Sequence, residues 1–123
     1  MASKVKKVSL DTILQKKGLI NEVKPFYSDF FGGEIDILSD IGEKIVKIMQ
    51  SKAEEMYKYY EVIYTACPVF RSKELVKEYG LDDPILVVKH IFDKNMGECL
   101  SLGNHILSVY GLLNEKFLEV KKP

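Results

Sequence analysis

The stretch formed by residues 60–92 constrains the fold of this 123-residue chain most strongly, because two apolar runs flank a short polar segment. The first run has helical spacing up to Pro68, which lacks an N–H and disfavours helical geometry at the residue before it. Ser72 then predicts an N-cap and Gly80 a C-terminal stop for a short helix. Residues 85–92 are apolar on most sides, so we expect them to form the central buried helix.

Amphipathic patterns continue on the N-terminal side of this stretch. Residues 41–49 and 56–67 place apolar side chains at the i, i+3 and i+4 spacing of core-facing helices. Asp40, with Glu43 three positions later, matches a capping box for the first of these helices, and Ser39 is the alternative N-cap. Their charged residues, Lys58 among them, are expected to face solvent.

Two further helices are expected at the ends of the chain. Ser9 caps a short helix that Gly18 would end, and residues 96–113 form the last long helix. Glycine costs about 1 kcal/mol in a helix interior relative to alanine, so Gly103 predicts the close approach of a neighbouring helix. The side chains expected in the core are Ile45, Ile48, Ile63, Cys67, Phe70, Leu75, Val88, Ile91, Leu100, Ile106 and Leu107, with Val69 also plugging it from the connector.

Residues 23–37 have a different character. Four aromatic residues precede Gly32-Gly33, and residues 34–37 then alternate strictly between charged and apolar side chains. Such a pattern is typical of a β-hairpin with a turn at the glycines. The chain is therefore expected to be an α+β protein: one mainly α-helical domain over residues 1–123, with five to six helices and one N-terminal hairpin. Residues 1–8 and 115–123 are expected to be loosely ordered.

Charge and hydropathy bear on the class of function. Lysine plus arginine equal aspartate plus glutamate at 18 each, which argues against a general nucleic-acid or anionic-membrane binder. The charge is uneven, however, since residues 1–25 carry six lysines against two acidic residues. No uncharged apolar stretch reaches the roughly 20 residues that span a bilayer, and the polar, basic start is unlike a signal peptide.

Candidate catalytic groups are few. Cys67 with His90 or His105 would suggest a thiol nucleophile and a base, but neither histidine lies in a recognisable motif. Both Cys67 and Cys99 lie on apolar helical patterns, which favours reduced, buried thiols. The acidic residues do not cluster as metal ligands do. We therefore expect no enzyme activity, no metal, no cofactor and no small-molecule substrate.

Two binding functions are open at this point. The two short helices within residues 72–92 would suit a small DNA-binding regulator of a mobile element, although residues 85–92 offer one lysine and one histidine to a groove. The alternative is a protein contact formed by the aromatic residues of the hairpin. These either build the core or lie exposed as a contact surface, and the candidates are Phe26, Tyr27, Phe30 and Phe31.

Several segments together resemble the XkdN-like family of phage tail assembly chaperones, found in contractile-tailed phages and PBSX-type prophages. The resemblance covers roughly residues 23–113 and is carried by FFGGEIDI, YEVIYTACPVFRSKEL, the Tyr79-Gly80 pair with Pro84, and KHIFDKNMGECLSLGNHILSVYGL. The segments around Cys67-Pro68 and Leu102-Gly103-Asn104 are the most specific.

The resemblance implies a non-enzymatic role in viral tail assembly. Proteins of this kind bind the long tape measure protein, keep it soluble and help tail tube subunits polymerise around it. They work in the host cytoplasm and are absent from the mature virion. The expected partners are thus the tape measure protein and the tail tube protein, together with further copies of the chain in a homo-oligomer. The family has no catalytic motif to place on this sequence.

Overall fold

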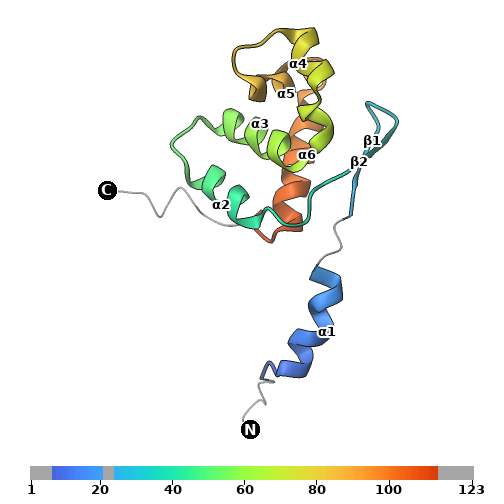
Figure 1. Ribbon diagram of the computed structural model, residues 1–123, viewed down its shortest axis with the longest axis vertical. Helices are drawn as coiled ribbons and strands as arrows, with labels where there is room; N and C mark the ends of the chain where they lie inside the picture. Colours follow the sequence, from blue (N-terminus) through green and yellow to red (C-terminus); the bar gives the residue numbers. More distant parts are fainter. Residues whose placement is uncertain (1–6, 21–23, 114–123) are drawn as a thin grey trace.

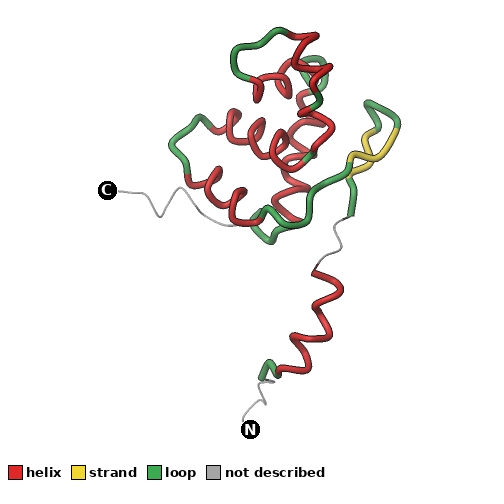
Figure 2. Tube along the Cα trace, viewed as in Figure 1, coloured by secondary structure: helices red, strands yellow, loops and turns green. Residues whose placement is uncertain are grey.

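Helix α3 (Glu55–Ala66) lies at the centre of the computed structural model, which describes residues 7–20 and 24–113 (Figure 1). Helices α2 (Gly42–Gln50) and α6 (Met96–Val109) pack against α3, as does α5 (Val87–Ile91). The fold is mainly helical with one two-stranded antiparallel hairpin, as the sequence predicted (Figure 2). None of the helices in the described ranges has the length and apolar character to cross a membrane.

The expectation of a central buried helix over residues 85–92 is wrong. This stretch divides into the 3-10 turn η2 (Pro84–Leu86) and the five-residue helix α5. Val87 and Val88 of α5 are buried, but Lys89 and His90 are exposed. The longer helix α3 takes the central place because it offers buried side chains to neighbours on several sides.

Most of the predicted core is buried. Ile45, Ile48, Ile63, Cys67, Phe70, Val88, Ile106 and Leu107 are all buried, whereas Leu75 and Ile91 are half-buried. Two of the expectations are wrong, because Leu100 is 38% exposed and Val69 is 57% exposed. On α6 the buried face instead runs through Leu102, one turn after Cys99.

Lys58 also departs from the sequence-based expectation, because it is 1% exposed on α3. Its Nζ donates a hydrogen bond of 3.1 Å to the carbonyl of Met49 in the last turn of α2, and lies 3.8 Å from Glu55 Oε1. The last carbonyls of a helix lack intrahelical donors and attract positive charge. The buried ammonium thus joins the end of α2 to the start of α3.

The helix boundaries follow the predicted stop and start residues in the middle of the chain. Helix α3 ends at Ala66, ahead of Pro68, which begins the 3-10 turn η1 (Pro68–Arg71). Helix α4 (Lys73–Tyr79) begins with Ser72, whose Oγ accepts from the N–H of Leu75, and ends at Gly80 with φ of 57°. Only a left-handed conformation gives this φ, and glycine adopts it without strain.

The predicted cap of α2 is wrong. The helix begins at Gly42 after Ile41, and no side chain caps it. The segment before it is tied down elsewhere, since Tyr110 Oη donates to the carbonyl of Leu38 and accepts from the N–H of Ile41 at 3.5 Å. Residues 51–54 separate α2 from α3. Tertiary contacts at the far end of α6 therefore replace the expected capping box.

The first helix, α1 (Leu10–Ile20), directly follows the predicted N-cap Ser9, whose Oγ accepts a hydrogen bond from the N–H of Thr12 at 3.2 Å. It does not end at Gly18 but continues to Ile20. Figure 1 shows α1 standing apart from the helices around α3. The contact of the domain with the N-terminal part of the chain thus runs through the hairpin.

The hairpin pairs strand β1 (Phe26–Ser28) with strand β2 (Gly33–Ile35). Its turn is not formed by the two glycines: Ser28 pairs with Gly33, and residues 29–32 form a four-residue loop. The predicted alternation after the turn is confirmed, since Ile35 and Ile37 are buried while Glu34 and Asp36 are exposed. The shifted turn places Phe30 and Phe31 in the loop rather than on a strand.

Gly103 is buried where α6 crosses α3, as its place in the sequence predicted. A Cβ added to Gly103 would lie 2.4 Å from Cδ2 of Tyr59, whose hydroxyl donates to Asn104 Oδ1 at 2.6 Å. The ring therefore has little freedom to move aside. Gly97, in the same helix, has open space around it, with Asn95 Oδ1 the nearest atom at 3.8 Å.

We predict that Gly103→Ala lowers the free energy of unfolding by about 1–3 kcal/mol through overpacking. The matched variant Gly97→Ala should be neutral or stabilising by up to about 1 kcal/mol, because alanine favours the helix and meets no neighbour. Urea denaturation of the two variants measures both effects. Equal changes in the two variants would contradict the close approach at Gly103.

Candidate protein-contact groove

The four aromatic residues of the hairpin lie in two different environments. Phe26 on β1 is half-buried, with its ring 5.6 Å from that of His105 on α6. Tyr27 points to the opposite side of the strand and is 59% exposed. Phe30 and Phe31, in the loop, are 42% and 51% exposed. Three of the four side chains are therefore exposed rather than part of the core.

The loop is held by a polar contact between Ser28 and Glu98. Ser28 is fully buried, and its Oγ donates to Glu98 Oε1, while Glu98 Oε2 accepts from the N–H of Phe30 at 3.2 Å. Ser28 Oγ in turn accepts from the N–H of Phe31 at 2.9 Å. Hydrogen bonds to a carboxylate are stronger than those between neutral groups. The loop backbone is thereby fixed to the first turn of α6.

Local structure positions Glu98 for this role. Asn95 caps α6, with its Oδ1 accepting from the N–H of Glu98 at 3.3 Å. A carboxylate in the first turn of a helix is stabilised by the unpaired N–H groups there. The side chain of Glu98 then reaches the hairpin, about 70 residues earlier in the chain. No local sequence pattern indicated the pairing of Glu98 with the hairpin.

The rings of Phe30 and Phe31 pack against the buried ring of Phe92. Their ring centroids are 4.8 Å apart, and both rings approach Phe92, at 6.3 and 5.7 Å. Phe92 is fully buried and lies 5.8 Å from Phe70. Tilted pairs at these distances are favourable beyond the area that they bury. One side of each loop phenylalanine is therefore packed, while the other faces solvent.

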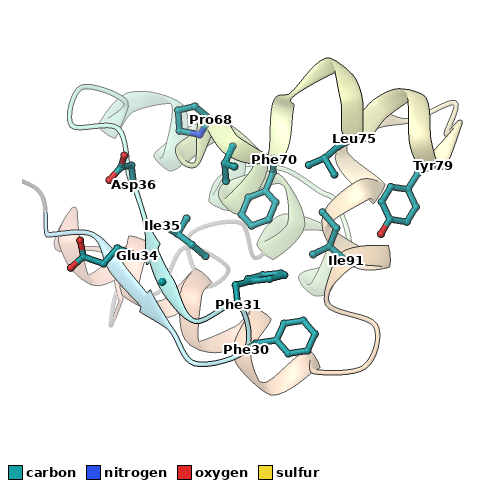
Figure 3. Close-up of a pocket in the computed structure, with 12 residues that line it drawn as sticks. Phe30, Phe31, Glu34, Ile35, Asp36, Pro68, Phe70, Leu75, Tyr79 and Ile91 are labelled. Atoms are coloured by element: carbon teal, nitrogen blue, oxygen red, sulfur yellow. The ribbon is translucent and has the colours of Figure 1, made fainter.

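The exposed side of this stack forms one wall of a groove with a volume of about 730 Å³ (Figure 3). The figure shows Phe30 and Phe31 on the hairpin side of the groove, and Leu75 and Tyr79 of α4 on the other side, with Ile91 between the two pairs. Residues of β2, η1, α4 and α5 line the groove together with the hairpin loop. The lining residues are Phe30, Phe31, Gly33, Glu34, Ile35, Asp36, Pro68, Val69, Phe70, Leu75, Tyr79 and Ile91.

The lining is apolar except at one end. Glu34 and Asp36 are its two charged residues, and both are acidic. All four aromatic residues of the hairpin were candidate contact residues from the sequence, but only Phe30 and Phe31 line the groove, and Phe26 and Tyr27 lie outside it. Val69 and Leu75 were expected in the core, and their exposure is explained by the groove that they line. Val69 and Leu75 can be recognised as groove residues only once the hairpin is known to lie beside α4, and no local sequence pattern indicates that arrangement.

The lining of this groove includes neither the cysteines nor the histidines. Cys67 and Cys99 are both buried and free, and burial raises the pKa of the Cys67 thiol to about 12 and that of Cys99 to about 11. An activated thiol needs a lowered pKa. His105 Nε2 is 3.1 Å from the carbonyl of Lys24, and His90 lies beside Tyr79. Within residues 7–20 and 24–113, no three potential metal ligands gather.

Comparison of the chain with protein-family models, with curated proteins and with solved structures finds no match.

The raised thiol pKa values predict a loss of stability at alkaline pH. An unfolded cysteine titrates near about 8.5, so the unfolded chain loses these protons at lower pH than the folded one does. The stabilisation that comes from keeping the two buried thiols protonated is complete below the pKa of the unfolded cysteine. It is lost as the pH rises toward the folded pKa values of about 12 for Cys67 and about 11 for Cys99. We expect the free energy of unfolding to fall between about pH 8 and about pH 10.

Denaturant unfolding at a series of pH values measures this fall. The control is the Cys67→Ala, Cys99→Ala double variant, whose decline over the same range should be shallower even though its stability is lower throughout. The same decline in both proteins would show that other groups cause it. Tyr57, whose pKa is raised to about 12 chiefly by its hydrogen bond to Asp83, acts in the same direction at higher pH.

Proposed function

We propose that this protein is a non-enzymatic tail assembly chaperone, which holds an apolar segment of a tape measure protein in the groove beside Phe30 and Phe31. The supporting observation is the pair of half-exposed phenylalanines fixed over an apolar groove. Large aromatic side chains that are rigidly held and partly exposed are the usual anchors of protein interfaces. The resemblance of residues 23–113 to the XkdN-like family supplies the biological setting.

The form of the groove suggests the chemistry of its occupant. Its long apolar lining suits the apolar face of an amphipathic helix, which would place anchors at i, i+3 or i+4, and i+7. The acidic end at Glu34 and Asp36 favours a helix with lysine or arginine beside the apolar face. A tape measure protein, which is long and helical, presents many such segments. Covering them would keep it soluble until tube subunits assemble around it in the host cytoplasm.

Preorganisation favours binding at this site. The Ser28–Glu98 contact and the stack on Phe92 hold the loop before a partner arrives. A partner therefore does not have to order the loop, and less of the contact energy is lost on binding.

The direct test is co-expression with the tape measure and tail tube proteins encoded beside it. We predict that the protein keeps the tape measure soluble and is recovered with it in a pull-down. The variant Phe30→Ser, Phe31→Ser should lower the recovered tape measure at least about tenfold, the scale on which interface anchors act. The control variant is Tyr27→Ser, which removes an equally exposed aromatic outside the groove and should bind normally.

Three results would contradict the proposal. The tape measure remaining insoluble with the intact protein would refute the chaperone function. Equal capture by the groove variant and the intact protein, both folded by circular dichroism, would refute the groove as the contact. Salt-dependent binding of duplex DNA without capture of either tail protein would favour the regulator instead.

A further inference from the structure

The exposed face of α1 is a second apolar surface without a partner in this structure. Leu10, Ile13 and Leu14 lie on one side of the helix and are 70%, 56% and 57% exposed. An amphipathic helix normally buries such a stripe, and clustered exposed apolar residues mark interaction sites. Figure 1 shows that α1 stands clear of the helices around α3, so none of these described helices covers the stripe.

The groove and α1 have opposite charge. The charged residues of the groove lining are Glu34 and Asp36. Exposed lysines at α1 include Lys7, just before the helix, and Lys16, within it, beside one exposed acidic residue, Asp11. The first 25 residues together carry six lysines against two acidic residues. Complementary charge around an apolar contact steers binding and fixes its orientation. Of the surfaces on this chain, α1 therefore has the chemistry that the groove requires.

We propose that α1 of one copy docks in the groove of a second copy, with its apolar face against Phe31, Val69 and Leu75. A second copy is the occupant because α1 of the same chain stands apart from the hairpin, α4 and α5 (Figure 1), which carry the residues that line the groove. The exchange is reciprocal, so a two-fold dimer forms the same contact twice and leaves neither surface exposed. This inference concerns the isolated protein and does not depend on the proposed tape measure partner.

Disulfide trapping between two differently tagged copies tests the exchange. One copy carries Ile13→Cys on the apolar face of α1, and the other carries Val69→Cys on the groove wall. Both positions are exposed, so the substitutions leave the core intact, and the native cysteines are buried. Docked cysteines react at high effective concentration, so the yield of mixed dimer should exceed that of the control at least about tenfold.

The control replaces Ile13→Cys with Gln15→Cys, an exposed position on the opposite side of the same helix. Equal yields from the two positions would reflect random collision and would overturn the proposal. A chain carrying both Ile13→Cys and Val69→Cys tests docking within one copy. An internal disulfide in that chain, with no mixed dimer from the separate copies, would also overturn the proposal, because α1 would then cover its own groove.

Discussion

The carboxylate of Glu98 fixes the part of the structure on which the groove depends. It accepts from the buried Ser28 hydroxyl and from the backbone of Phe30, and so attaches the hairpin loop to α6. A two-stranded hairpin is marginally stable alone, and this one has three residues in each strand. Without the contact, the loop would lose the position that places Phe30 and Phe31 over Phe92.

The hairpin, the groove and α1 have a common physical basis. The helices around α3 bury enough apolar surface to form a core, and the loop adds two phenylalanines that the core covers only on one side. Helix α1 adds a second exposed apolar surface, formed by Leu10, Ile13 and Leu14. Exposed apolar surface on a small protein favours association with other proteins. The proposed binding of a client, and of another copy, rests on this exposed apolar surface.

Local rules predicted the features that depend on neighbours in sequence. Pro68 ends α3, Ser72 caps α4, and Gly80 adopts the positive φ at its end, because each effect acts through the backbone within a few residues. The alternation that buries Ile35 and Ile37 was predictable for the same reason. Gly103 is different, since only its cost in a helix indicated that another helix must approach.

The groove could be predicted only in part. Aromatic density indicated Phe30 and Phe31 together with Phe26 and Tyr27, which lie outside the groove. The partner Glu98 and the opposite wall at Leu75 come from distant segments. The prediction for Lys58 was wrong for a similar reason. A lysine on a helix is usually exposed, and the carbonyl of Met49, which accepts the hydrogen bond of its ammonium group, belongs to another helix. Apolar residues lining a groove have the same sequence pattern as core residues, which explains the error at Val69, whereas Leu100 is exposed outside the groove lining.

A double-mutant cycle on Ser28 and Glu98 tests most directly whether their contact fixes the hairpin. The free energy of unfolding is measured for Ser28→Ala, Glu98→Ala and the double variant. Since the two side chains share a hydrogen bond, we predict a coupling energy of about 0.5–3 kcal/mol. Faster hydrogen exchange at the Phe30 amide should accompany each single change. Additive effects, with Phe30 still protected from exchange, would contradict the account.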